Sequence, residues 1–222
     1  MNIRLAKENM IKQQVRTLGL PYGDLLSVII DIPREVFVPN NFRDVAYSEV
    51  EIPLNHGQSE LMLQTITKIL QRLQPKKHEK TLEIGCGSGY FTALLARLTK
   101  FVDVIDQHED MLTHVYISLK KIGIYNAKFH VNVQGNTKKL TQLLQHNDTF
   151  DLIVIKNMQR FKPKDFLKYL SAKGRMLFFL EKENYARAIL VQKMTDGTFL
   201  QMPAFDVYKS MNKKLQDKVF QF

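Results

Sequence analysis

The sequence contains one cysteine, no tryptophan and no long apolar run. The single cysteine, Cys86, excludes an intramolecular disulfide and fits a reducing compartment, so we expect a cytoplasmic protein. No apolar stretch reaches the roughly 18 to 20 residues that a membrane-spanning helix needs, and the N-terminal stretch lacks the apolar core of a signal peptide. No cysteine–histidine cluster has zinc spacing, and no internal repeat is present. Disulfide-rich, membrane-spanning, zinc-binding and repeat classes are therefore not expected, and we expect no metal.

The length and charge describe one basic globular unit. The chain has 222 residues, of which 45% are hydrophobic, which suffices for one α/β domain with an N-terminal extension. Its formal charge of +10 raises the question of a nucleic-acid partner. The lysines are scattered as doublets on expected loops and helix surfaces, so the pattern favours a solvated surface over a nucleic-acid-binding stripe. The doublets are Lys76-Lys77, Lys120-Lys121, Lys138-Lys139 and Lys213-Lys214.

One glycine-rich turn dominates the pattern. An apolar run at 81–84 leads into three alternating glycines, Gly85, Gly87 and Gly89, and residues 90–98 then have a helical apolar face. A strand, a glycine loop and a helix in this order predict the nucleotide-binding turn of a doubly wound α/β fold. Glycine permits the tight turn and lets a ligand approach bare backbone amides, although such a turn can also serve close packing alone.

The acid before this turn indicates the kind of ligand. Glu83 places a carboxylate at the mouth of the loop, and the glycines do not follow the G-x-G-x-x-G spacing of dinucleotide loops. A carboxylate repels phosphates and suits a cation such as S-adenosylmethionine, which carries an ammonium and a sulfonium. Asp106 ends the next expected strand, where an acid can accept both ribose hydroxyls of a nucleoside. A helix N-cap or an exposed turn are the other interpretations of Asp106.

The loop resembles motif I of the class I methyltransferases, and further segments narrow the resemblance. In order along the chain, they are Met10–Thr17, Ile32–Pro39 (IPREVFVP), Ala46-Tyr47, Ile52–Leu54, His56–Ser59 (HGQS) and Leu82–Tyr90. Together they resemble the protein-L-isoaspartate (D-aspartate) O-methyltransferases, and the C-terminal Phe-x-Phe resembles a divergent bacterial branch of that family. The P-R-E-x-F-V-P and H-G-Q-[ST] segments are peculiar to it.

The resemblance implies a fold, a cofactor and a reaction. The fold would be a class I S-adenosylmethionine-dependent methyltransferase α/β sandwich, Rossmann-like, with an N-terminal helical cap. Residues 1–75 would form the cap on the substrate side, and 76–222 the cofactor domain of one compact unit. The reaction would methylate the carboxylate of isoaspartyl residues in damaged proteins, which is a repair activity. The partner would be an isoaspartyl peptide or protein, with no membrane or nucleic acid, and the chain would be a monomer or dimer.

The resemblance also implies site residues. His56 and Ser59 would be the catalytic residues on the substrate side, although His56 could also simply cap its loop. Ser59 and Gln58 could touch either the methionine end of the cofactor or the substrate backbone. The cofactor residues would be Gln58, Glu83, Gly85, Cys86, Gly87, Ser88, Gly89, Asp106, Gln107 and Asn136. No catalytic base is expected, because an ionised carboxylate is already a nucleophile and the enzyme mainly aligns the reactants and excludes water.

Several positions depart from the family pattern. The family segment continues Thr-Ile-Ser-x-Pro, so its serine falls on Leu61 and its proline on Leu63. Losing that hydroxyl removes a hydrogen bond to a charged group worth roughly 1.5 to 3 kcal/mol. Asn136 replaces the acid that accepts from adenine, or is an ordinary turn residue, and Lys156 and Asn157 replace small residues at the pocket floor. These departures leave two alternatives open: another acceptor, such as nucleic acid or a small molecule, or a non-catalytic cofactor-binding protein.

Periodicity predicts the remaining elements. Helices are expected at 7–18, 22–30, 61–73, 108–121 and 166–170. Strands are expected at 102–105, 129–133, 150–155, 174–180, 186–193 and 207–222, with extended backbone at 46–47 and 49–54.

Overall fold

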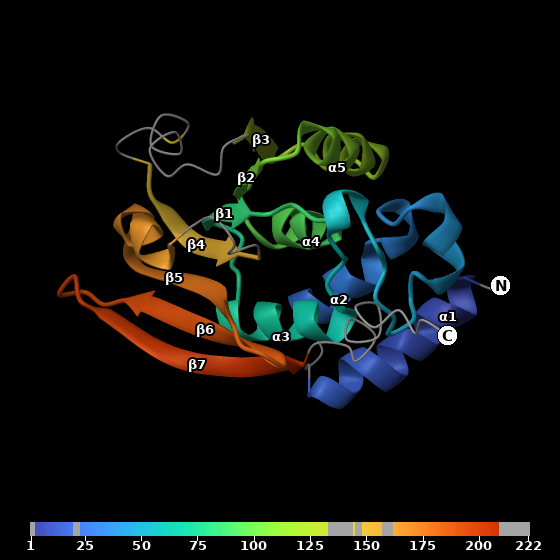
Figure 1. The fold of residues 1–222 in the computed structure, drawn as a ribbon, viewed down its shortest axis with the longest axis horizontal. Coiled ribbons are helices and arrows are strands. Elements are labelled where there is room, and N and C mark those ends of the chain that lie inside the picture. The colour runs from blue at the N-terminus through green and yellow to red at the C-terminus, as the bar shows by residue number, and fades with distance from the viewer. Residues whose placement is uncertain (1–2, 20–22, 133–143, 145–147, 157–161, 209–222) are drawn as a thin grey trace, which may run out of the picture.

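The computed structural model describes residues 3–19, 23–132, 144, 148–156 and 162–208. Within them, one seven-stranded sheet has the order β3-β2-β1-β4-β5-β6-β7 (Figure 1). The first five strands of this order run parallel, and β6 pairs antiparallel with both β5 and β7. The strands are β1 (Lys80–Ile84), β2 (Phe101–Asp106), β3 (Ala127–Val131), β4 (Phe150–Ile155), β5 (Leu170–Glu181), β6 (Tyr185–Lys193) and β7 (Phe199–Tyr208). The order reverses between β1 and β4, which is where doubly wound sheets bind ligands.

The two faces of the sheet pack into two separate cores. On β4, Leu152 and Val154 join one core, whereas Ile153 and Ile155 join the other. This division follows from the alternation of side chains along a strand. Because both faces of the central strands are buried, their sequences are continuous apolar runs rather than alternating ones.

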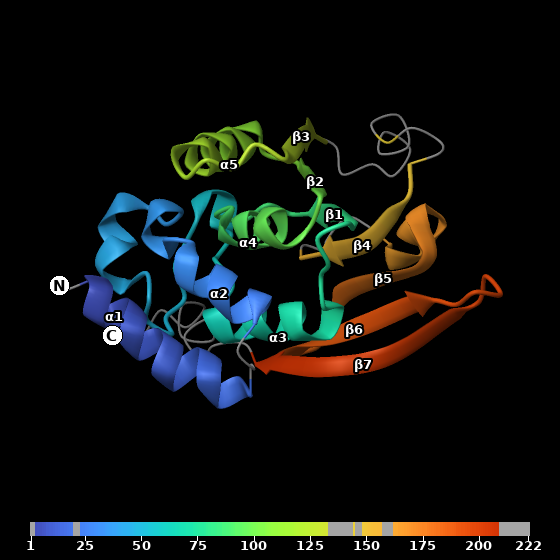
Figure 2. The ribbon, with the colours of Figure 1, turned by 180° about the vertical axis from the view of Figure 1, so that it is seen from behind.

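Helices supply the cover. They are α1 (Ile3–Met10), α2 (Asp24–Asp31), α3 (Leu63–Leu73), α4 (Tyr90–Leu98) and α5 (Glu109–Lys121). A π-helical segment (Ile11–Val15) and a 3₁₀ turn (Arg16–Leu18) extend α1, and Gly19 ends it with φ of 71°. Further 3₁₀ turns are Arg34–Val36, Asn40–Val45, Asn55–Gly57 and Pro163–Tyr169. The N-terminal helices pack beside α3 and α4, as both views show (Figures 1 and 2), so the expected helical cap is present.

The predicted parallel strands are confirmed, and two expectations are wrong. The last strand is Phe199–Tyr208 rather than 207–222, and residues 209–222 lie outside the described part of the chain. Residues 46–54 form no strand apart from a single bridge between Pro53 and Ser59. There the backbone bonds locally, because Glu60 N donates to Ile52 O and Leu54 N donates to Gln58 O, at 2.8 Å each. The segment is thus a small hairpin with His56 at its tip.

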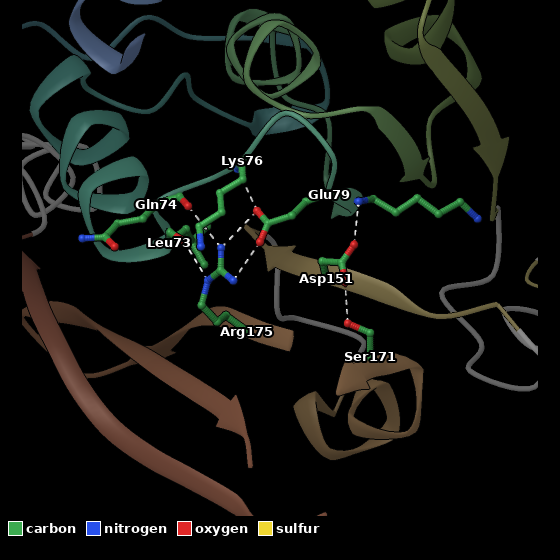
Figure 3. A network of polar contacts seen from close by, with 8 residues as sticks. Leu73, Gln74, Lys76, Glu79, Asp151, Ser171 and Arg175 are labelled. Carbon is green, nitrogen blue, oxygen red and sulfur yellow. Dashed lines mark hydrogen bonds and ion pairs between the residues drawn. The ribbon is translucent and has the colours of Figure 1, made fainter. Parts of the chain in front are cut away.

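The amino edge of the sheet is tied together by a polar network (Figure 3). Glu79, just before β1, accepts two hydrogen bonds from the Arg175 guanidinium, at 2.9 and 3.1 Å, and one from Lys76 N at 2.7 Å. Arg175 also donates to the carbonyls of Leu73 and Gln74 at the end of α3. This network fixes α3 to the start of β1 and to β5.

Among the described residues, none lies in a helix long and apolar enough to cross a membrane.

Candidate active site

The glycine loop between β1 and α4 lies at the carboxyl edge of the sheet. Gly85, Gly87 and Gly89 all have positive φ, at 86°, 59° and 91°, a conformation that other residues rarely adopt. A Cβ on Gly89 would lie 2.7 Å from both methyl groups of Val115 on α5, so this glycine serves close packing. Gly87 instead faces charged groups from two other segments.

Glu83, at the end of β1, is paired inside the protein. Its carboxylate is fully buried and lies 2.5 Å from the Lys156 ammonium at the end of β4. Lys156 also donates to the carbonyl of Cys86 at 3.0 Å and lies over the Phe91 ring. Burial raises the pKa of Glu83, and the nearby ammonium opposes that rise. Burial alone would lower the pKa of Lys156, but Glu83 and Glu60 outweigh it and raise the pKa, so Lys156 stays charged.

Glu60 brings a second carboxylate to the same loop. It lies between the hairpin and α3, is 7% exposed, and accepts a hydrogen bond from Ser88 N at 3.1 Å. A Cβ built on Gly87 would lie 3.6 Å from Glu60 Oε2 and 3.7 Å from Lys156 Nζ. The bare face of Gly87 is therefore met by a carboxylate and an ammonium of the chain itself.

Asp106 fixes the start of the adjacent loop. Its carboxylate accepts from Cys86 N at 2.9 Å and from His108 N at 3.0 Å, so it anchors the glycine loop and the turn that leads into α5. Each oxygen keeps a further lone pair for a ligand hydroxyl. Asn132 N donates to the Asp106 carbonyl, and both polar atoms of the buried Asn132 side chain have no hydrogen-bond partner.

The hairpin tip docks on the start of α5. His56 has φ of 58°, stacks on the His108 ring at 3.7 Å between centroids, and lies 2.9 Å from Asp110 through Nε2. Asn55 also donates to Asp110 at 3.2 Å. These hydrogen bonds hold the pKa of Asp110 below its usual range, with His56 contributing most. The hairpin is thereby attached to the helix that follows Asp106.

The other predicted residues of this region have mainly local partners. The Ser59 hydroxyl donates to Glu51 at 2.5 Å. Gln58 closes the hairpin turn through its backbone, and Gln107 contacts the neighbouring His108 ring at 2.8 Å. Burial raises the pKa of the Cys86 thiol, so the thiol stays protonated and is no nucleophile. Asn136 and Asn157 lie outside the described residues.

Arg34 connects the N-terminal segment to this edge, although it was not among the predicted site residues. It is almost fully buried, donates to the Leu61 carbonyl at 3.0 Å and lies over the Tyr90 ring of α4. Tyr47 accepts from Arg34 N at 3.2 Å and donates to Glu35. The PREVFVP segment, which Tyr47 holds, thus contacts Leu61, the residue after Glu60. The signal was available, because Arg34 and Tyr47 both belong to segments that carry the family resemblance.

Comparisons with known proteins agree on one family. The sequence profile of "Protein-L-isoaspartate(D-aspartate) O-methyltransferase (PCMT)" matches residues 6–209. A protein-L-isoaspartate O-methyltransferase from Petrotoga mobilis is 26% identical, over 89% of this chain and 90% of its own. One from Flavobacterium psychrophilum is 27% identical, over 95% of this chain and 94% of its own.

Solved structures share the fold. A putative protein-L-isoaspartate O-methyltransferase from Plasmodium falciparum, in complex with S-adenosyl-L-homocysteine, has a TM-score of 0.74 at 16% identity. The alignment covers 90% of this chain and 95% of that one. A second structure of a protein-L-isoaspartate O-methyltransferase has a TM-score of 0.67 at 15% identity, covering 97% and 71%. At these identities the likeness establishes the class I methyltransferase fold.

The cofactor is S-adenosyl-L-methionine. Most of the residues described above at the carboxyl edge of the sheet suit it. The buried carboxylates of Glu83 and Asp106 favour a ligand of net positive charge, and the unpartnered Asn132 amide offers a donor and an acceptor beside Asp106. The fit is incomplete at the glycine loop, because Glu60 and Lys156 already bond its backbone.

Proposed function

Because the chain belongs to the protein-L-isoaspartate (D-aspartate) O-methyltransferase family, we propose that it methylates the free carboxylate of isoaspartyl residues in damaged proteins. It is a methyltransferase that uses S-adenosyl-L-methionine, and the proposal concerns its acceptor and its role in repair. The acceptor would be a peptide or protein of the cytoplasm, consistent with the single buried cysteine.

The convergence of the segments peculiar to this family carries the proposal. Arg34 of the PREVFVP segment holds the Leu61 carbonyl, and the His56 hairpin is attached to Asp110 of α5. Both contacts border the glycine loop, although the segments are far apart in the chain. A methyltransferase of another class would not need these N-terminal segments at its cofactor edge.

The chemistry asks little of the protein. When bound, the cofactor supplies an electrophilic methyl group on a sulfonium, which is a good leaving group. An ionised carboxylate attacks without a base, so the chain has to orient the acceptor and exclude water. In keeping with this role, the Cys86 thiol stays protonated and buried. We assign His56 and Ser59, both on the hairpin, to the acceptor side.

Leu61 is the hairpin-side residue that departs most clearly from the family pattern. The family serine is absent, so the side chain offers no hydroxyl to an acceptor carboxylate. Its backbone is nevertheless fixed, because the carbonyl accepts from Arg34 at 3.0 Å. The proposal therefore expects activity in the natural chain, and higher activity once a hydroxyl is restored.

The test compares two peptides of identical sequence, one with isoaspartate and one with aspartate. S-adenosyl-L-homocysteine and the methanol released from the labile ester are measured for the natural chain, for Leu61→Ser, and for Leu200→Ser as a control on the exposed face of β7. We expect turnover with the isoaspartyl peptide only, raised by Leu61→Ser and unchanged by the control. If neither the natural chain nor Leu61→Ser turns over while both bind S-adenosyl-L-homocysteine, the isoaspartyl acceptor is wrong.

A further inference from the structure

Two charged side chains of this protein already bond the backbone of the glycine loop. Glu60 accepts from Ser88 N at 3.1 Å, and Lys156 donates to the carbonyl of Cys86 at 3.0 Å. Both groups lie against the bare face of Gly87, less than 4 Å from where its Cβ would be. The face on which glycine would admit a ligand is therefore in contact with the chain's own carboxylate and ammonium.

The amino-acid end of the cofactor carries the same two kinds of charged group. S-adenosyl-L-methionine ends in a carboxylate and an ammonium, and its ammonium is attracted to buried Glu83. That carboxylate, however, already holds the Lys156 ammonium at 2.5 Å. Two ammonium groups at one buried carboxylate repel each other, and one backbone N–H makes only one good hydrogen bond. The cofactor and the side chains cannot satisfy the same atoms at once.

We propose that the Glu60 carboxylate and the Lys156 ammonium occupy the place of the cofactor's amino-acid end on the glycine loop. Both side chains leave the loop when the cofactor binds. The pair weakens the binding of a ligand's amino-acid end and has no effect on the binding of its nucleoside end. The proposal concerns the cofactor alone and does not depend on which acceptor is methylated.

The charges and positions of the pair support this role. One negative and one positive group add no net charge, so the site stays complementary to a cationic cofactor. Both side chains are long, and Glu60 lies in the irregular connection between the hairpin and α3.

The experiment measures dissociation constants by calorimetry for two probes. S-adenosyl-L-homocysteine carries the amino-acid end and no net charge, and 5′-deoxy-5′-methylthioadenosine carries only the nucleoside end. The variants are Glu60→Ala, Lys156→Met and the double variant, with Glu183→Ala and Lys121→Met as exposed controls away from the loop. Glu60→Ala leaves the Glu83–Lys156 pair intact, so it tests the proposal even if Lys156→Met does not fold.

Freeing the Ser88 amide for the ligand carboxylate should tighten S-adenosyl-L-homocysteine binding by about ten-fold or more in Glu60→Ala. The double variant should bind S-adenosyl-L-homocysteine at least as tightly as Glu60→Ala does. Methylthioadenosine should bind all variants with the affinity it has for the natural chain. The proposal is overturned if Glu60→Ala binds S-adenosyl-L-homocysteine more weakly or with unchanged affinity, or if both probes change equally. Weaker binding would mean that Glu60 contacts the cofactor directly.

Discussion

Two buried glutamates lie at opposite ends of β1, and their surroundings differ. Glu79, at the amino edge, is 4% exposed and receives two hydrogen bonds from Arg175 and one from the Lys76 amide (Figure 3). Glu83, at the carboxyl edge, is fully buried and holds the Lys156 ammonium, and no backbone amide of a described residue donates to it.

The difference separates a structural edge from a functional one. A planar guanidinium that bonds a carboxylate through two nitrogens is rigid and well satisfied, whereas a lysine ammonium on a flexible stem can exchange partners. Ligands of doubly wound sheets bind at the carboxyl ends of the strands, where Glu83 lies. We therefore expect substitutions at the amino edge to change stability, and those at the carboxyl edge to change ligand affinity.

The largest effect should come from Arg175→Met. This change leaves the Glu79 carboxylate buried without its cation, which typically lowers the free energy of unfolding by about 3 to 5 kcal/mol. Urea unfolding measures the change, and Arg187→Met is the matched control, because the Arg187–Asp206 pair on β6 and β7 is partly exposed and contributes little. A loss as small as that of the control would show that the Glu79 network does not hold the edge.

A smaller effect is expected from Arg34→Met. The substitution keeps the apolar volume beside Tyr90 and removes the hydrogen bond from a cation to the Leu61 carbonyl, worth roughly 1.5 to 3 kcal/mol. Stability should fall, and affinity for S-adenosyl-L-homocysteine should rise, because the connection that carries Glu60 loosens its hold on the Ser88 amide. Exposed Arg72 on α3 provides the control, as Arg72→Met. Unchanged affinity in Arg34→Met would show that the N-terminal segment does not influence cofactor binding.

The smallest effect concerns the exposed contact between His56 and Asp110. Its hydrogen bonds lower the pKa of Asp110 from an ordinary value of 3.8, so the contact stabilises the fold above about pH 4. That contribution is lost as the pH falls through the folded-state pKa. His56→Ala should raise the pKa of Asp110 towards 3.8, as followed by carboxyl NMR. His114→Ala, on the same helix as Asp110, should leave that pKa unchanged. An unmoved pKa in His56→Ala would mean that the hairpin is not attached to α5 in solution.

The local parts of this structure could be predicted from the sequence. The glycine turn and the parallel strands are visible as short apolar runs beside glycines, because strand, turn and helix are neighbours along the chain. The start of β7 was missed, although Asp196-Gly197 is a hairpin signal between β6 and β7. Its turn is closed by Met194 N, which donates to Thr198 O.

The contacts of the candidate site could not be predicted in the same way. Glu60 and Ser88 are 28 positions apart in the chain, and Glu83 and Lys156 meet only because β1 and β4 are neighbours in the sheet. Sequence patterns give the direction of a side chain relative to its own element, and not the partner that another element brings. The roles of Glu83 and of the other predicted cofactor residues stay predictions until a ligand is measured.

The most direct test compares the two ends of β1 in one titration. The affinity for S-adenosyl-L-homocysteine is measured for the natural chain, Glu83→Gln and Glu79→Gln, with unfolding followed in parallel. The account predicts that Glu83→Gln weakens binding by about ten-fold or more, because the ligand ammonium loses its carboxylate, while Glu79→Gln lowers stability and leaves affinity unchanged. Equal affinities in both variants, or a loss confined to Glu79→Gln, would contradict it.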